Sequence, residues 1–241
     1  MTAQLRTLGI IGGDGRMGQA VEAASDGRYD VQARITLDQT DYAALSACDC
    51  IIDFSAGPAL LAALPHLNAD TPIVSGTTGL SEAEDKTVAE ASQTIPIFRS
   101  GNFSLGIAVL SSLARQAASA LGEGWDIEIL EMHHRHKLDA PSGTGLMLGE
   151  AVAEGRGVTL ADVAAHDRVG KRKDGDIGFA VLRGGGVYGL HEVRLTSESE
   201  MITLGHQALN RNVFAHGALA AADWMIGKPP GLYSMSELID L

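Results

Sequence analysis

The chain of 241 residues is long enough for one large or two small domains. Its 45% hydrophobic and 20% charged residues are ordinary for a folded domain, and its net charge of −12 argues against nucleic acid or an anionic membrane as a partner. No segment approaches the roughly 20 apolar residues of a membrane span. The first residues, MTAQLRTLGIIGG, lack the long apolar core of a signal peptide, so we expect a cytoplasmic protein.

The first hundred residues alternate between short apolar runs and helical patterns. The runs predict strands at 7–12, 29–37, 48–55, 71–79 and 95–98. Helical patterns at 16–25, 57–67 and 81–92 separate them, and Ser81 with Glu84 forms a capping box at the start of the third. This alternation is typical of a Rossmann-type doubly wound parallel sheet.

The pattern changes after Asn102. Helices are predicted at 105–121, 143–155 and 214–227, and a strand at 125–134. The segments 177–185, 191–199 and 200–207 resemble long antiparallel strands. We therefore predict an α/β protein with a second, α+β domain, built on a mixed, largely antiparallel sheet.

The run GIIGGDGRMG, from Gly9 to Gly18, lies between a predicted strand and a predicted helix. It fits two glycine patterns: Gly13, Gly15 and Gly18 match G-x-G-x-x-G, and Gly12, Gly15 and Gly18 match G-x-x-G-x-x-G. In either register the glycines allow a tight turn and a close approach to a pyrophosphate at a helix N-terminus. We predict a dinucleotide site here; a strand–helix turn without a ligand is the alternative.

Asp38 ends the second predicted strand, 20 residues after Gly18 (38 − 18), where the fingerprint places an acid on the ribose. A plain turn residue is the alternative interpretation. Gln39 follows it instead of a basic residue, and a carboxylate repels the 2′-phosphate of NADP. These residues favour NADH over NADPH, a preference that Arg16 and Arg34 weaken.

Two further loops follow predicted strands, SGTTG and SGNFS. Because ligands of open α/β sheets bind at the carboxyl ends of strands, both loops are candidates for the nicotinamide half of the cofactor. Plain loops are the alternative.

The densest polar cluster is EMHHRHKLDAPSGTG, Glu131–Gly145, with three histidines, an arginine and a lysine between His133 and Lys137. It fits a metal site, a structural polar cluster or a pocket for an anionic substrate with an acid catalyst. Neighbouring histidine side chains diverge, and Cys48 and Cys50 are too few for a zinc site, so we expect no metal. Histidine titrates near neutrality and can donate a proton, which favours the substrate pocket.

The same cluster ends in PSGTG, in which Ser142 is a good N-cap for the following helix. The first N–H groups of that helix are suited to an anion, Gly143 permits a close approach, and Thr144 adds a hydroxyl. A cationic loop opposite a helix N-terminus suits a substrate with two carboxylates.

Taken together, the chain resembles the 4-hydroxy-tetrahydrodipicolinate reductase family, also called dihydrodipicolinate reductase, of lysine and diaminopimelate biosynthesis. The resemblance covers essentially the whole chain, and its motifs occur in the family's order: GGDGRMG, DFS, SGTTG, SGNFSLG, EMHHRHKLDAPSGT, RGGGVYGLHEV, GHQALNRNVFAHGAL and GLYSMSEL. It departs from relatives in the short segment TDYAALSACD after Asp38, which concerns the adenine side, and in Gln39.

The resemblance implies reduction of a cyclic unsaturated dicarboxylate by NADH or NADPH, with a catalytic pair and a homotetramer. The implied catalytic residues are His133 as proton donor and Lys137, and substrate would be bound by His134, Ser142, Gly143 and Thr144. The implied cofactor residues are Gly12, Gly13, Asp14, Gly15, Arg16 and Met17 at the pyrophosphate, Asp38 at the ribose, and Gly76, Thr77, Thr78, Ser100, Gly101, Asn102 and Phe103 around the nicotinamide. We also expect Asp14 to favour NADH.

The implied domains are a dinucleotide-binding domain, 1–103 and 214–241, and a substrate-binding and oligomerisation domain, 104–213. Two other functions stay open at this point: a nucleotide-sensing protein without turnover, and a related dehydrogenase of another small acid.

Overall fold

The computed structural model describes residues 5–240; residues 1–4 and 241, which belong to the predicted first domain, lie outside the described part. The described chain divides into two compact units. One contains the chain up to Ser104 and again from Asn212 to Asp240, and the other contains Leu105–Arg211. No helix in residues 5–240 combines the length and the apolar character that spanning a bilayer requires.

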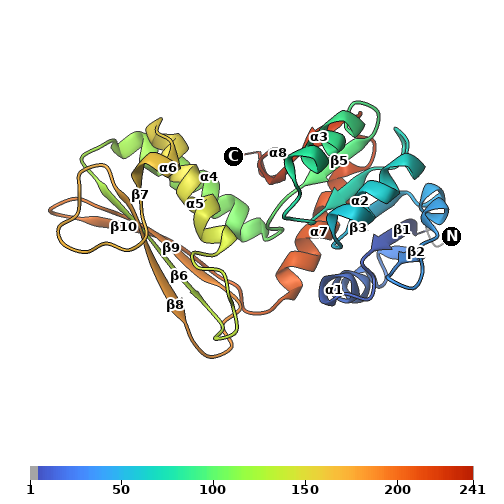
Figure 1. Ribbon diagram of the computed structural model, residues 1–241, viewed down its shortest axis with the longest axis horizontal. Coiled ribbons are helices and arrows are strands. Elements are labelled where there is room, and N and C mark those ends of the chain that lie inside the picture. The colour runs from blue at the N-terminus through green and yellow to red at the C-terminus, as the bar shows by residue number, and fades with distance from the viewer. Residues whose placement is uncertain (1–4, 241) are drawn as a thin grey trace. The chain divides into compact units, whose positions relative to one another are not determined.

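The first unit is built on a parallel sheet. Its strands are β1 (Arg6–Ile11), β2 (Tyr29–Ile35), β3 (Cys50–Asp53), β4 (Ile73–Ser75), β5 (Pro96–Arg99) and β11 (Gly231–Tyr233). They form a 6-stranded sheet in the order β11-β5-β4-β3-β1-β2, in which every neighbouring pair is parallel (Figure 1). Since β2 and β3 lie on opposite sides of β1, the strand order reverses there, and such a switch point is where ligands bind in open sheets.

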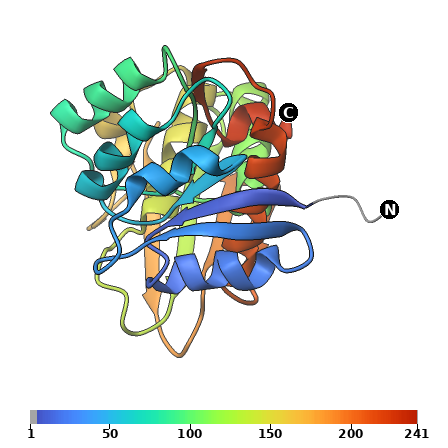
Figure 2. The same ribbon diagram turned by 90° about the vertical axis from the view of Figure 1, so that its right-hand side faces the viewer.

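Helices cover both faces of this sheet. They are α1 (Arg16–Ser25), α2 (Gly57–Ala63), α3 (Glu82–Ala91), α7 (Asn212–Met225) and α8 (Met235–Ile239), with 3-10 turns at Tyr42–Ala47 and Leu64–His66. Figure 2 shows α1 beside the blue strands β1 and β2, with the teal and green helices on the opposite side. The predicted capping box of Ser81 and Glu84 is confirmed at the start of α3.

The core of the first unit consists of branched aliphatic side chains from these strands and helices. Neighbouring strands contribute Ile11, Ile51, Ile73 and Ile97 to one buried cluster. On the other face α7 packs closely, because a Cβ at Gly217 would lie 1.6 Å from the carbonyl oxygen of Phe103. Only glycine permits this approach of helix and loop.

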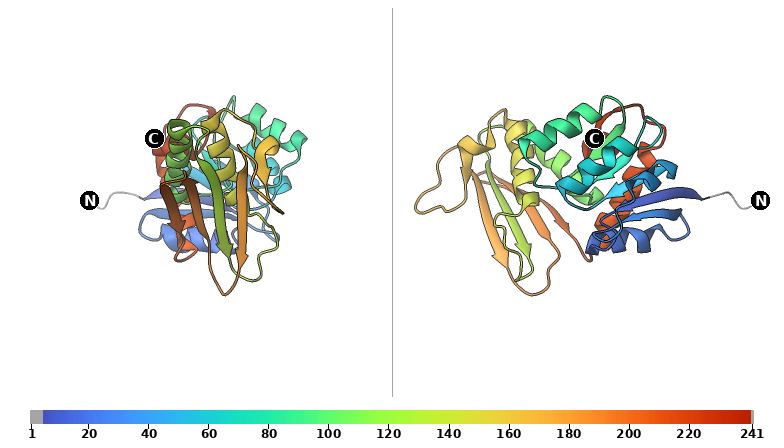
Figure 3. Two further views of the ribbon diagram at one scale, coloured as in Figure 1. Left: turned by 90° about the vertical axis from the view of Figure 1, so that its left-hand side faces the viewer. Right: turned by 45° about the vertical axis from the view of Figure 1, so that its right-hand side comes forward.

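The second unit is a mixed sheet with helices on one face. Its strands are β6 (Asp126–His133), β7 (Ala164–Ala165), β8 (Ile177–Arg183), β9 (Leu190–Thr196) and β10 (Met201–Gln207), and its helices are α4 (Leu105–Leu121), α5 (Gly143–Arg156) and α6 (Leu160–Val163). The strand order is β10-β9-β6-β8-β7. Figure 3 shows the strands side by side with α4 and α5 packed against them, and the buried cluster includes Leu110 of α4, Leu148 of α5 and Ile129 of β6.

One predicted pairing in this unit is wrong. The segment at 177–185 was expected as an antiparallel strand, but β8 pairs with β6 in parallel, while β9 and β10 are antiparallel as predicted. The helix α5 lies between β6 and β8 in the chain, and such a crossover lets the second strand run in the direction of the first.

A strand and a helix at the end of the first unit were not predicted. Strand β11 and helix α8 follow Pro229 and Pro230 near the C-terminus. A three-residue strand carries too little alternation to be detected from sequence, and β11 forms because the edge of β5 pairs with Gly231–Tyr233. The last long helix also begins at Asn212, two residues before the predicted start.

Candidate active site

The structure distinguishes the two glycine registers of the turn after β1. Gly12 has a φ of +79°, and a Cβ on Gly18 would lie 2.2 Å from the Gly12 carbonyl oxygen. A Cβ on Gly13, by contrast, would meet nothing closer than 3.6 Å. The positions that require glycine are therefore Gly12 and Gly18, which belong to the register with Gly15 between them.

This turn opens onto a cavity of about 330 Å³ at the switch point of the sheet. Gly12, Asp14 and Gly15 line it, as do Leu37 after β2 and Tyr42. Gly15 is the N-cap of α1 and offers no side chain, so the first N–H groups of the helix have no side-chain acceptor. A helix terminus of this kind favours an anion.

The charged residues near this cavity differ in whether they line it. Asp14 lines the cavity, whereas Asp38 lies exposed in the bend after β2 and is not among the lining residues. Arg34 is paired with Glu22 of α1, its Nε lying 2.9 Å from Oε2. No ion pair links Arg16 to Asp14 within the described chain. Arg34, which weakened the expected preference for NADH, is thus partly neutralised.

The loops after β4 and β5 lie together. Thr77, Thr78, Ser100 and Gly101 line one cavity of about 340 Å³. Gly76 is required by packing, because a Cβ there would lie 2.2 Å from the Phe54 ring. The two loops that were predicted separately therefore form one wall.

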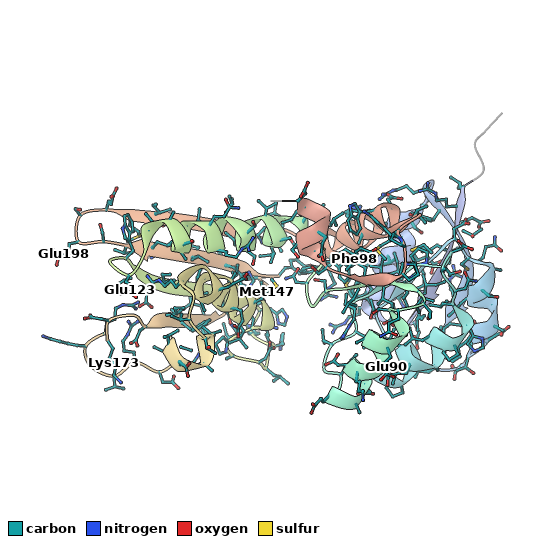
Figure 4. All side chains as sticks on the ribbon, turned by 90° about the horizontal axis from the view of Figure 1, so that it is seen from above. Glu90, Phe98, Glu123, Met147, Lys173 and Glu198 are labelled. Carbon is teal, nitrogen blue, oxygen red and sulfur yellow. The ribbon has the colours of Figure 1, made fainter. Side chains whose placement is uncertain are left out.

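Asn102 and Phe103 lie beside this wall in different ways. The Asn102 Oδ1 accepts a hydrogen bond from the Ser104 N–H at 2.8 Å, which shapes the loop. The Phe103 ring is 2% exposed and packs against Phe54 and Phe98 at centroid distances of 5.4 and 5.9 Å. Figure 4 labels Phe98 within this unit. The Phe103 ring therefore packs in the core, so this residue could contact a ligand only through its main chain.

In the second unit, the end of β6 holds a buried acid–histidine pair. His133 and Glu131 are 7% and 0% exposed, and the His133 Nδ1 lies 2.5 Å from Glu131 Oε2. Arg183 at the end of β8 binds both Glu131 oxygens, at 2.9 and 2.8 Å. If Nδ1 donates its N–H to the ionised Glu131, Nε2 is the nitrogen of His133 that takes up and releases a second proton.

Hydrogen bonds keep the carboxylate of this pair ionised although it is buried. Burial would raise the pKa of Glu131, but its hydrogen bonds from Arg183 and His133 outweigh that effect and lower it. Burial lowers the pKa of His133, Glu131 acts against this, and Lys137 adds to the lowering. The free protein therefore keeps Glu131 ionised and favours the neutral His133 ring.

The N-terminus of α5 is attached to the same group. The Ser142 N–H donates to Glu131 Oε1 at 2.9 Å, and its hydroxyl caps Gly145 N at 3.1 Å. The Ser142 hydroxyl also lies 3.4 Å from the Nε2 of His191, a buried residue of β9. The predicted catalytic histidine and the predicted N-cap thus share one buried network.

The remaining predicted substrate residues lie on the loop and helix around this network. Lys137 Nζ is 2.9 Å from Asp139 Oδ1. The Nδ1 of His134 is buried without a hydrogen-bond partner among the described residues. Gly143 is exposed, and a Cβ there would meet no atom within 4 Å, so the space above the first turn of α5, beside Thr144, is open.

Glu131, His133 and His191 also come close enough to hold a metal ion, with ligand atoms within 4.8 Å of one another. The surroundings argue against it. Both Glu131 oxygens already accept hydrogen bonds from Arg183, whose guanidinium repels a cation. The group therefore suits proton transfer better than metal binding.

Three residues of this network were missed from the sequence: Glu131, Arg183 and His191. Glu131 could have been found, because side chains two residues apart on a strand point to the same face, and Glu131 is two residues before His133. Arg183 and His191 could not, because they come from β8 and β9. Strand register places Arg183 opposite His133, and His191 opposite Glu131.

His191 makes the second unit sensitive to acid. Burial, with repulsion from His133 second, lowers the pKa of His191 to about 4. An unfolded chain, with a histidine pKa of about 6.5, binds the proton first, so stability is lost as pH falls from about 6.5 towards about 4. The loss attributable to His191 is roughly 3 kcal/mol. Urea unfolding at pH 7 and pH 4.5 should show a smaller acid loss in His191→Gln than in the wild type; equal losses would contradict this.

Both units match known protein families. The family model described as "Dihydrodipicolinate reductase, N-terminus" matches residues 6–103, and "Dihydrodipicolinate reductase, C-terminus" matches 106–239. The 4-hydroxy-tetrahydrodipicolinate reductase of Caulobacter vibrioides is 47% identical over 96% of each chain. That of Zymomonas mobilis is 46% identical over 97% of each.

A solved structure agrees on the fold. The dipicolinate-bound dihydrodipicolinate reductase of Paenisporosarcina sp. TG-14 matches with a TM-score of 0.75, covering 98% of this chain and 100% of that one, at 20% identity.

Proposed function

The chain belongs to the dihydrodipicolinate reductase family, and we propose that its two units divide that reaction between them. The protein is an NAD(P)H-dependent oxidoreductase that reduces the dehydrated form of 4-hydroxy-tetrahydrodipicolinate to tetrahydrodipicolinate. In our proposal residues 1–103 and 214–241 bind the dinucleotide, and residues 104–213 bind the substrate and form the oligomer. The observation that supports this most is the buried Glu131–His133 pair beside the N-terminus of α5.

The substrate site that we propose has Lys137 and His134 on one side and a helix terminus on the other. Lys137 attracts a carboxylate, and His134 offers a hydrogen bond to it. Ser142, Gly143 and Thr144 present the first turn of α5, where the positive end of the helix and the open space above Gly143 suit an anionic group. The dipicolinate in the Paenisporosarcina structure is a dicarboxylate, which agrees with such a site.

His133 is the proton donor in this proposal. When bound, the reduced nicotinamide supplies a hydride to the conjugated imine; His133 supplies the proton, so two hydrogens and two electrons are added to the ring. Binding of a dicarboxylate brings negative charge to the ring of His133 and raises its lowered pKa. The histidine therefore acquires its proton together with the substrate, and Lys137 acts beside it.

The dinucleotide site that we propose runs along the carboxyl ends of the strands. The turn from Gly12 to Met17 holds the pyrophosphate, and Asp38 holds the ribose. The nicotinamide would be held by Gly76, Thr77, Thr78, Ser100, Gly101, Asn102 and the main chain of Phe103. The two cavities at β1 and β4 support this placement.

We propose that NADH is preferred over NADPH. Asp14 lines the cavity and Asp38 follows β2, and both carboxylates would repel a 2′-phosphate. Arg34 is paired with Glu22, which weakens its attraction for that phosphate. Asp14→Ala should shift the ratio of kcat/KM for the two cofactors towards NADPH several-fold. Asp26→Ala, at the opposite end of α1, is the matched control. An unchanged ratio in Asp14→Ala would leave Asp14 without a role in selectivity.

We also propose a cytoplasmic homotetramer. The sheet of the second unit carries exposed apolar side chains at Leu182 on β8 and at Met201 and Ile202 on β10. Burial of such side chains between copies is favourable. Sedimentation of the purified protein would identify the assembly.

The activity is tested by a coupled assay. Aspartate semialdehyde, pyruvate and the upstream synthase generate the substrate, and oxidation of NADH or NADPH is followed by absorbance. We expect oxidation that depends on the synthase and is faster with NADH. Binding of the dinucleotide without any oxidation would indicate a sensor, and oxidation with another small acid alone would indicate a different dehydrogenase.

A further inference from the structure

Asp53 is a buried carboxylate that the proposed reaction does not use. It is the last residue of β3 and is 0% exposed. It lies between Ile11 of β1 and Ser75 of β4 in the register of the sheet. Its neighbours in β3, Ile51 and Ile52, are apolar and equally buried, so an aliphatic side chain would suit packing better than an acid.

The carboxylate accepts hydrogen bonds from the loop after β3, from the end of β4 and from the loop after β4. Oδ1 accepts from the Ser55 N–H at 3.0 Å and from the Ser55 hydroxyl. Oδ2 accepts from the Ser75 hydroxyl at 2.7 Å and the Thr77 hydroxyl at 2.8 Å. Burial raises the pKa of Asp53, and the hydrogen bonds that it accepts act against that rise.

These donors connect the walls of the two cavities. Ser55 lines the cavity beside the glycine turn, and Thr77 lines the cavity of the β4 and β5 loops. The Ser55 N–H is also 3.2 Å from the Thr77 hydroxyl. A backbone hydrogen bond joins the same two segments, because the Gly76 N–H donates to the Asp53 carbonyl oxygen at 2.8 Å. Both walls are therefore fixed to one side chain.

We propose that Asp53 is a positioning residue that sets the separation of these two walls, and through it the affinity for the dinucleotide. The inference rests on the cofactor site of the proposed function. A buried polar group is costly unless it is hydrogen-bonded, and this fully hydrogen-bonded acid holds the segments after β3 and β4 in one relative geometry. The dinucleotide must contact both walls at once, so a small displacement of either weakens its binding.

Ser75 provides the sharpest test, because it is buried in β4, contacts Asp53 and lines neither cavity. Ser75→Ala removes the hydrogen bond to Asp53 Oδ2 and the weaker one that the Ser75 hydroxyl accepts from the Thr77 N–H at 3.3 Å, and it removes no atom that lines a cavity. We expect it to raise the Kd for NADH about threefold to tenfold, the range for one lost hydrogen bond. The KM for NADH should rise more than kcat falls.

Asp53→Asn should have the larger effect, about tenfold or more on the same Kd, because its amide group faces donors on both sides. The matched control is Ser92→Ala. Ser92 is a buried serine of the same unit whose hydroxyl donates to the Ala89 carbonyl oxygen at 2.7 Å, away from both cavities. We expect wild-type NADH binding in that control. If Asp53→Asn fails to fold, the comparison of Ser75→Ala with Ser92→Ala decides the question alone.

The readouts are the Kd for NADH from fluorescence or calorimetry and the thermal unfolding temperature of each variant. Asp53 would be a structural residue only, and the proposal overturned, if Ser75→Ala and Asp53→Asn lowered the unfolding temperature but bound NADH like Ser92→Ala. Weaker NADH binding in these variants without any reductase activity in the wild type would instead reject the proposed function and leave the role of Asp53 intact.

Discussion

Replacing His133 with glutamine is expected to lower kcat by about 10²–10⁴-fold, the usual contribution of a general acid, and to change the KM for the substrate far less. Glutamine retains a side chain that can donate to Glu131, so the buried network persists. It cannot take up and release a proton at Nε2. The measurement is steady-state kinetics with saturating NADH, together with a pH profile of kcat/KM.

His136→Gln is the matched control for this prediction. His136 is an exposed histidine on the same loop, three residues further on. We expect kinetics close to the wild type, because no part of the proposed mechanism uses it. Near-normal turnover in His133→Gln would remove His133 from the proton-donor role, and an equal loss in His136→Gln would point to the loop as a whole.

The second large effect is expected from Arg183→Met. Glu131 is ionised and buried, and Arg183 binds both of its oxygens. Removing one partner of a buried ion pair typically costs about 3–5 kcal/mol, because the other charge is left without compensation. Urea unfolding at neutral pH should therefore show a much less stable second unit.

The pH dependence of this effect has a definite sign. Arg183 helps to keep the pKa of Glu131 below its ordinary value, so the stability that the pair contributes is present at neutral pH. As pH falls and Glu131 takes up a proton, the difference between Arg183→Met and the wild type should shrink. A difference that grows in acid would contradict the role of Arg183 as counter-ion.

Arg194→Met is the control for Arg183→Met. Arg194 on β9 pairs with Glu192 at 2.6 Å, and its side chain is 44% exposed. Exposed ion pairs are worth about 0–1 kcal/mol, so the same substitution should cost little there. Similar losses in both variants would show that the methionine, and not the uncompensated Glu131, is responsible.

Local sequence patterns predicted the elements that depend on their own residues. The helix at 105–121 coincides with α4, because its apolar face and helix-forming residues extend over the whole segment. The capping box of Ser81 and Glu84 is closed by residues three apart, so it could be recognised without a fold. The glycine turn was equally visible, but its register was not. The two patterns differ in Gly12 and Gly13, and only the positive φ of Gly12, beside the free space at Gly13, distinguishes them.

The sequence alone therefore determined most kinds of element, the family resemblance and the candidate residues between His133 and Thr144. The tertiary structure decided which groups meet. Arg183 and His191 reach Glu131 by the register of three strands, and Asp53 meets Ser75 and Thr77 through the pairing of β3 with β4. Such contacts join residues distant in the chain, and their geometry follows from the hydrogen-bonded order of a sheet, which no local pattern contains.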